Sequence, residues 1–332
     1  MVFDKPFLTY EQQIALLRSR GLIISDDKFA EQALSTLSYY DLINRYKSHF
    51  MNPDDSFNEG ITLEYLYNFL LFDKDVQSFV MKYSLLVESI FKTKLAYTLS
   101  QYFGVDHAKY LNANNFLSSI DALKFTDIQL EIIGYISSDK VKDPTRHYKL
   151  HHNHIPPWIL LKNVSLGNSI NLYRFLIGNA KHTITDEMIP STQISFSDKV
   201  DFISNALNDI RLFRNSAAHN LNFTELQVKA IYRPSSSTLY KILGNALLKR
   251  KKKKIIDSDK QSVGGIYGCL LSILVLLNDD YLRARFITDF LTVISGTEPA
   301  IQNQLYGTYS QVTAMPPDII NRFGQYYSSL MV

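Results

Sequence analysis

Three residues close together in the chain could act jointly on a phosphate ester. Arg214 carries a permanent positive charge that can bind and stabilise anionic oxygens. His219 is of the residue type that transfers protons near neutral pH, and Asn215 could orient either the histidine or the bound group. The opposing interpretation is structural, with an arginine in an ion pair and a histidine that closes a helix. The spacing of Arg214 and His219 alone does not separate the two.

An amphipathic helix is predicted to carry these residues. Its apolar side chains recur at the spacing of one helical face, at Val200, Ile203, Leu207, Ile210, Phe213 and Ala217. Ser197 is the predicted N-cap. A helical wheel places Arg214 inside the apolar stripe and Asn215 and His219 on its flank. Because a buried guanidinium is costly without a partner, we expect either an internal carboxylate or a groove or subunit seam at Arg214.

The longest predicted helix supplies a candidate carboxylate. Its periodicity runs from about Thr62 to Phe103, and Gly104 ends it. Glu88 lies beside the apolar stripe, four residues before Lys92, a spacing that usually gives a modest surface ion pair. We hypothesise that Glu88 instead meets Arg214 inside the fold.

A run of cations is the best candidate for contact with a phosphate backbone. The net charge is only +3, so a nucleic-acid site requires local clustering. The cluster consists of Lys249, Arg250, Lys251, Lys252, Lys253 and Lys254. A solvated helix end or loop would also explain such a run.

A second basic segment contains Arg146, His147 and Tyr148, followed by further histidines up to His154. Prolines on both sides predict a short or irregular segment. It fits a solvated polar loop or a loop that touches RNA. It also contains a second Arg–His spacing, and its histidines raise the question of a metal. No nearby cysteine or carboxylate completes a common zinc pattern, so we predict neither a metal nor a cofactor.

Composition and boundaries indicate a folded, helical protein. Hydrophobic residues make up 46% and charged residues 20%, and Cys269, the single cysteine, excludes an internal disulfide. No apolar segment reaches the roughly 20 residues that cross a bilayer, so no membrane association and a cytoplasmic location are expected. Polar breaks divide the chain into an N-terminal small helical region (1–55), a core with the Arg–His residues (56–235) and a C-terminal helical region with the basic run (236–332).

The order of short segments resembles the Abi-like family of bacterial abortive-infection proteins, of the AbiD/AbiF type, over residues 5 to about 235. The segments are Lys5 to Thr9, Glu11 to Gln13, Arg20 to Leu22, Leu37 to Tyr40, Phe72-Asp73, Glu88 with Lys92, Pro157-Trp158, Ser165 to Gly167, and Arg214-Asn215 with His219. The sequence departs from the family pattern at Lys92, where Arg is common, and at Lys162, where an acidic residue often stands. Both departures put in doubt an ion-pair network carried over from relatives.

The resemblance implies an all-α fold, a HEPN-type helical bundle with N-terminal and C-terminal helical extensions. The Arg–x4–6–His pattern of HEPN ribonucleases then implies a metal-independent endoribonuclease with Arg214, Asn215 and His219 as catalytic residues. Other implied properties are defence against bacteriophage, a cognate small noncoding RNA as partner, and a homodimer that completes the site. Two alternatives stay open: a catalytically silent RNA-binding protein of the same fold, and a module that senses a phage protein.

Overall fold

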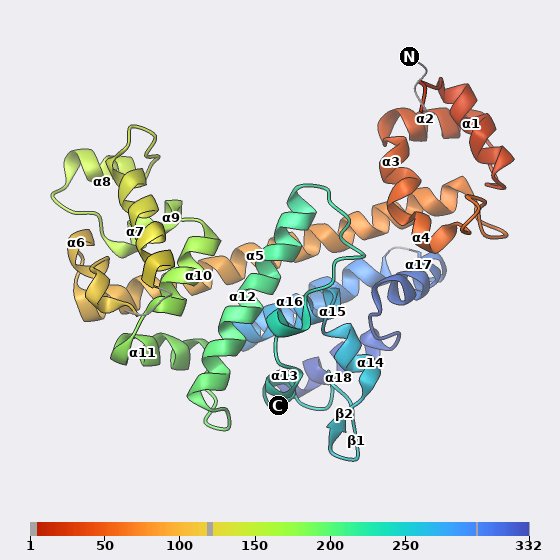
Figure 1. Ribbon diagram of the computed structural model, residues 1–332. Coiled ribbons are helices and arrows are strands. Elements are labelled where there is room, and N and C mark those ends of the chain that lie inside the picture. The colour runs from red at the N-terminus through yellow and green to blue at the C-terminus, as the bar shows by residue number, and fades with distance from the viewer. Residues whose placement is uncertain (1–4, 118–121, 297, 332) are drawn as a thin grey trace. The chain divides into compact units, whose positions relative to one another are not determined.

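The computed structural model describes residues 5–117, 122–296 and 298–331, apart from the side chains of residues 122–125 and 299 (Figure 1). The described chain is almost wholly helical, which confirms the predicted all-α class. The α-helices are α1 Tyr10–Ser19, α2 Asp27–Thr36, α3 Tyr39–Leu42, α4 Lys47–Phe50, α5 Leu63–Phe103, α6 His107–Tyr110, α7 Ala122–Ser137, α8 Thr145–His151, α9 Pro157–Asn163, α10 Leu166–Phe175, α11 Gly178–Met188, α12 Phe196–Ala218, α13 Ser236–Leu243, α14 Asp257–Ser262, α15 Ile266–Leu276, α16 Asp280–Ser295, α17 Pro299–Thr313 and α18 Ile319–Leu330. The 3₁₀ turns are Asn44–Tyr46, Ala113–Asn115 and Ala230–Tyr232.

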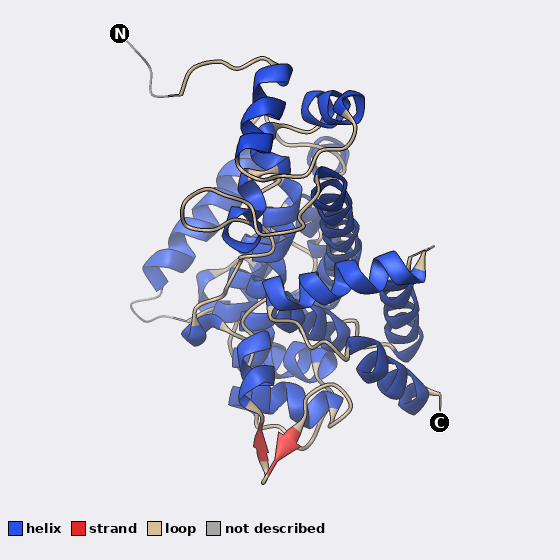
Figure 2. Cartoon of the chain, turned by 90° about the vertical axis from the view of Figure 1, so that its right-hand side faces the viewer, coloured by secondary structure: helices blue, strands red, loops and turns tan. Residues whose placement is uncertain are grey.

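The strands that the structure describes form one small hairpin. β1, Arg250–Lys251, pairs antiparallel with β2, Lys254–Ile255. The hairpin stands out against the surrounding helices (Figure 2). Within the described residues, no helix has both the length and the apolar character that crossing a membrane requires.

The chain forms two compact units. The first comprises Met1–Ser78 and Val293–Val312, and the second comprises Phe79–Thr292 and Thr313–Val332. The domain boundaries expected near residues 55 and 235 from composition stay a prediction.

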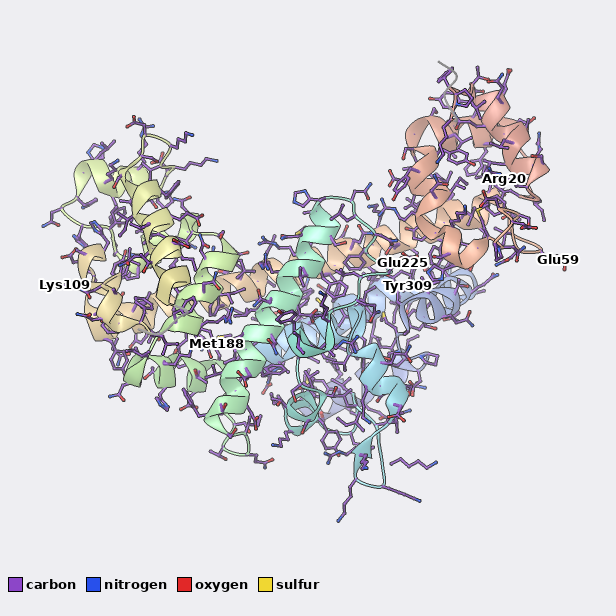
Figure 3. The ribbon with its side chains drawn as sticks, in the orientation of Figure 1. Arg20, Glu59, Lys109, Met188, Glu225 and Tyr309 are labelled. Carbon is purple, nitrogen blue, oxygen red and sulfur yellow. The ribbon has the colours of Figure 1, made fainter. Side chains whose placement is uncertain are left out.

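The first unit is organised around one buried carboxylate. Asp73, on α5, accepts hydrogen bonds from the hydroxyls of Tyr46 (2.7 Å) and Tyr309 (3.0 Å) and from the amide of Gln77 (2.8 Å). All four side chains are buried; Tyr309 is labelled in Figure 3. Burial raises the pKa of Asp73, and the hydrogen bonds from the two tyrosines and the glutamine oppose that shift. The Phe72-Asp73 segment therefore serves the core of this unit.

The second unit is built on α12 and α15, which pack against each other. α15 is buried along its whole length, and Cys269 is buried within it. Its neighbours in the sequence, Leu270 and Leu271, are apolar and predict this burial. An aromatic cluster joins α5, α16 and α18, where the Phe79 ring lies 5.1 Å from that of Phe290 and the Phe290 ring lies 5.2 Å from that of Phe323. These contacts hold α5, the helix that carries Glu88, against α16 and α18.

Two predicted helix boundaries were wrong. The N-cap of α12 is Ser195, whose hydroxyl accepts from the Asp198 N–H, and Ser197 lies inside the first turn. The apolar positions from Ile159 to Phe175 predict a single helix opened by Pro157, but this helix does not continue to Phe175. It ends at Asn163, and α10 begins after Ser165, which caps it. Both segments are apolar, so their hydrophobic pattern hides the break.

Candidate functional site

The C-terminal end of α12 positions the candidate histidine. His219 is the C-cap residue, and Asn220 follows in the left-handed region with φ +53°. The N–H of Leu221 donates to the Ser216 carbonyl (2.9 Å) and that of Asn220 to the Ala217 carbonyl (3.3 Å). These two bonds form a Schellman motif, which fixes the direction in which the chain leaves the helix. His219 is exposed at this end of α12.

Arg214 is paired inside the fold with the predicted partner. Its Nη1 donates to Oε2 of Glu88 on α5 at 2.5 Å, and the two side chains are 23% and 16% exposed. This contact confirms the hypothesis that Glu88 meets Arg214. Arg214 can therefore lie within the apolar stripe of α12, as the helical wheel predicts, because the Glu88 carboxylate pairs with its guanidinium there.

Glu88 serves two cations at once. Its Oε1 lies 2.7 Å from Nζ of Lys92, and the same ammonium donates to the Val164 carbonyl at 2.6 Å. The departure from the family pattern at Lys92 therefore leaves an ion-pair network in place. One carboxylate between two cations leaves a net charge of +1, which favours an anionic ligand.

Asn215 contacts the arginine. Its Oδ1 accepts from Nη2 of Arg214 at 3.3 Å. Of the two roles expected for Asn215, this contact fits the one in which it orients the group that binds phosphate. The guanidinium still has N–H donors to offer, because Glu88 and Asn215 account for two of its five.

The basic run forms the β1–β2 hairpin. Its first two cations are held by the fold: Lys249 is ion-paired with Asp318, and the Arg250 guanidinium lies 3.8 Å from the centre of the Tyr240 ring. The remaining four, Lys251, Lys252, Lys253 and Lys254, are exposed. Side chains project from the hairpin into solvent (Figure 3).

The hairpin loop consists of two lysines in an unfavourable conformation. Lys251 pairs with Lys254, so Lys252 and Lys253 form a two-residue loop, with φ +49° and +65°. Type I′ turns require positive φ at both positions and normally use Asn and Gly. Lysine pays a steric cost there, and strained residues of this kind cluster at functional sites.

The second basic segment is a short helix, α8. Arg146 and His147 are exposed on it and Tyr148 is half-buried. The rings of this helix pack on one another, with His147 4.7 Å from His151 and Tyr148 stacked at 4.4 Å on His152. Among the residues that the structure describes, no group of three or more His, Cys, Asp or Glu is placed to hold a metal ion.

The structure brings only part of the predicted site together. Arg214, Asn215 and His219 lie in the last turn of α12 and at its cap. The β1–β2 hairpin lies at the opposite end of the second unit, and α8 lies apart from both (Figure 1). A single RNA would have to be extended to contact all three groups.

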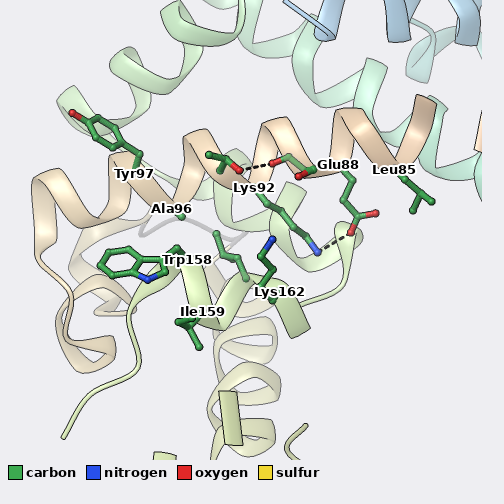
Figure 4. A pocket seen from close by; sticks show the side chains of 11 residues that line it. Leu85, Glu88, Lys92, Ala96, Tyr97, Trp158, Ile159 and Lys162 are labelled. Atoms are coloured by element: carbon green, nitrogen blue, oxygen red, sulfur yellow. Dashed lines mark hydrogen bonds and ion pairs between the residues drawn. The ribbon is translucent and has the colours of Figure 1, made fainter. Parts of the chain in front are cut away.

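Glu88 also lines a pocket that the sequence did not predict. It has a volume of about 560 Å³ between α5 and α9, and its lining includes Glu88, Lys92, Tyr97, Trp158 and Lys162 (Figure 4). In the sequence, Pro157-Trp158 predicts the start of a helix and does not indicate a pocket. The only hint of the pocket in the sequence is a tryptophan at the start of a helix. Whether that indole is exposed depends on how α9 packs against α5, which the sequence does not show.

No curated protein and no solved structure matches the chain. The family model for Abi-like proteins matches residues 32–224, more than half of the sequence, and this region contains α5, α9, α12 and the Glu88–Arg214 pair. Membership of this family suggests a role in abortive infection, the defence of bacteria against bacteriophage. The chain belongs to the family of Abi-like proteins.

Proposed function

We propose that this protein acts in abortive infection as an RNA-binding, metal-independent endoribonuclease of the HEPN type. The observation that carries the proposal is the end of α12, where Arg214 is held by Glu88 and Asn215 beside an exposed His219. A fixed cation and a proton-transfer group are the two components that cleavage of RNA through its own 2′-hydroxyl requires.

In the proposed reaction, the 2′-oxygen attacks the adjacent phosphorus while His219 takes the 2′-hydroxyl proton. The 2′-O–P bond forms and the P–O5′ bond breaks, and the leaving 5′-oxygen takes up a proton. Arg214 stabilises the charge on the non-bridging oxygens. The products are a 2′,3′-cyclic phosphate and a 5′-hydroxyl.

We further propose that the active form is a homodimer. One His219 can act as base or as acid in a given step, and a second copy supplies the other group. The four projecting lysines of the hairpin, with Arg146, His147 and Tyr148 on α8, are proposed to contact the RNA backbone outside the cleavage site. A cognate small noncoding RNA is the proposed regulatory partner.

The second candidate function is RNA binding without cleavage. It is supported by the net charge of +1 on the Glu88, Lys92 and Arg214 cluster, which attracts a phosphate whether or not His219 transfers a proton. In this case Arg214 and His219 bind an RNA without cleaving it, and replacing either residue abolishes RNA binding.

Sequencing of the RNA that copurifies with the protein, with mapping of its end groups, separates the two functions. The wild type is compared with Arg214→Ala and His219→Ala, and with Arg285→Ala as a matched control that removes an ion-paired arginine of the same unit. The nuclease predicts fragments with 2′,3′-cyclic ends from the wild type and Arg285→Ala alone. The same intact RNA in all four preparations would contradict cleavage of the bound RNA. Loss of RNA from the Arg214 and His219 variants would favour the silent binder.

A further inference from the structure

We propose that the pocket between α5 and α9 binds one unpaired nucleotide of single-stranded RNA, with its base against Trp158 and its phosphate toward Lys92 and Lys162. The inference rests on the proposed binding of RNA and names the form of RNA that the site accepts. Neither the Arg–His residues nor the hairpin accounts for this pocket.

One end of the pocket offers an aromatic surface to solvent. Trp158, in the first turn of α9, is 48% exposed although Pro157, Leu160 and Leu161 of the same short helix are buried. The buried residues fix α9 against the core through one face of the helix. The indole projects from another face and therefore remains outside the core. Tyr97, on α5, stands at the rim and is 62% exposed. Aromatic side chains presented in this way stack on unpaired bases, with about 1–3 kcal/mol for each base.

The other end of the pocket is cationic. Lys162 lies four residues after Trp158, so both project from the same face of α9. Lys162 is exposed, and it forms no ion pair with any described residue. In Figure 4 its ammonium points into the same space as that of Lys92, beside the carboxylate of Glu88. An aromatic surface and a pair of amines about one helical turn apart match the base and phosphate of one nucleotide.

The size and charge of the pocket favour a nucleotide over an apolar protein segment. Its volume of about 560 Å³ lies in the range of small-molecule sites. Glu88, Lys92 and Lys162 would be left with poorly solvated charges under an apolar segment. A duplex keeps its bases stacked and paired, so only an unpaired base can reach the indole.

Glu88 connects this pocket to the candidate cleavage site. Its Oε1 contacts Lys92 in the pocket, and its Oε2 contacts Arg214. A strand anchored by one base in the pocket therefore brings a neighbouring phosphate to Arg214. The pocket is the subsite that selects unpaired RNA for the proposed reaction.

Trp158 is the only tryptophan of the chain, so its fluorescence reports on the pocket directly. The test uses the full chain carrying His219→Ala, in which cleavage should be strongly slowed, titrated with a short oligoadenylate. We expect RNA to quench Trp158 fluorescence in a saturable way. The dissociation constant from this quenching should equal the one measured by fluorescence anisotropy of labelled RNA. The same strand in a duplex should cause no quenching.

In the His219→Ala background, Lys162→Ala and Trp158→Ala should each weaken RNA binding measured by anisotropy about tenfold. Lys109→Ala, an exposed lysine on α6, should leave it unchanged (Figure 3).

Three results would overturn the inference. RNA binding by anisotropy with unchanged Trp158 fluorescence would remove the pocket and leave the proposed RNA binding intact. Fluorescence that shifts with protein concentration in the absence of RNA would show that a second copy covers the pocket. No RNA binding by either method would remove the pocket and the proposed function together. A wild type that shows the quenching but does not cut would keep the pocket and refute the nuclease.

Discussion

At Arg214, one carboxylate holds a guanidinium and an ammonium in the same half-buried space. Removing Glu88 would leave two poorly solvated cations, and removing Arg214 would leave Glu88 with Lys92 as its remaining partner, so either change should lower stability. Sequence reasoning could find this pair because both partners lie beside apolar stripes of long, regular helices. It could not find the pocket that Glu88 also lines, since the exposure of Trp158 depends on how two helices pack.

The Glu88–Arg214 pair makes a prediction about stability. Glu88→Ala and Arg214→Ala should each lower the free energy of unfolding, and the double variant should lose less than their sum, by about 0.5–3 kcal/mol. Denaturant unfolding of the four proteins measures this coupling. Glu88→Ala combined with Arg285→Ala is the control, because these residues do not touch, and its effects should add. If the effects of Glu88→Ala and Arg214→Ala add in the double variant, the ion pair contributes no coupling free energy to stability.

Asp209, on the inner face of α12, makes a prediction about pH. It is fully buried, and neither carboxylate oxygen has a hydrogen-bond partner within the described part of the chain. Burial raises the pKa of this carboxyl well above its usual range, and Arg233 opposes the shift. The native state therefore keeps a proton that the unfolded chain releases above about pH 4. From there up to the native pKa, stability should fall as pH rises, by up to about 1.4 kcal/mol per pH unit.

Unfolding curves over a pH series test this statement. Asp209→Asn cannot ionise, so its stability should lack the decline that Asp209 contributes. Asp198→Asn, an exposed position in the first turn of the same helix, should retain it. Equal pH slopes for the wild type and Asp209→Asn would mean that Asp209 is ionised in the folded protein.

At the scale of the elements, local sequence signals predicted helix ends correctly where capping residues or glycines set the boundary. Thr9 followed by Gln12 predicts a capping box and Gly21 predicts a helix end. The capping box is present at α1, and Gly21 and Gly104 follow their helices at positive φ. The β1–β2 hairpin could not be predicted, because Lys252 and Lys253 have no preference for the turn that they form. Instead, Arg250 of β1 packs on Tyr240, and Lys249, just before β1, pairs with Asp318.

The hairpin loop allows charge and strain to be separated. Replacing Lys252 by Asn and Lys253 by Gly supplies the residues that a type I′ turn prefers, so stability should rise by about 1–2 kcal/mol. If the hairpin contacts RNA, the same variant should bind less tightly. The slope of log affinity against log salt concentration should fall by about 1.4 for two lost contacts with single-stranded RNA.

A matched variant completes the comparison. Lys251→Ala with Lys254→Ala removes two charges but leaves the loop residues unchanged, so it should weaken RNA binding without the gain in stability. Thermal unfolding and salt-dependent anisotropy measure both properties. An unchanged salt slope in both variants would exclude the hairpin from the RNA site.

For the whole molecule, the proposal requires two chains. Leu212, in the last part of α12, and Leu221, just beyond its cap, are exposed apolar side chains beside the candidate catalytic residues. Leu212→Glu with Leu221→Glu should yield a monomer that still binds RNA and no longer cuts it. Sedimentation velocity and cleavage assays measure this. A wild type that is monomeric at micromolar concentration, alone and with RNA, would exclude a composite site.

The most direct test of the account is cleavage of a single-stranded RNA by the purified protein in the presence of a chelator, with the end groups of the products determined. We predict 2′,3′-cyclic phosphate and 5′-hydroxyl ends from the wild type, and a rate lower by about 10²–10⁴-fold in His219→Ala. Arg285→Ala should cut at the wild-type rate. Cleavage that persists in both His219→Ala and Arg214→Ala, or products with 3′-hydroxyl ends, would contradict the assignment of the active site to the end of α12.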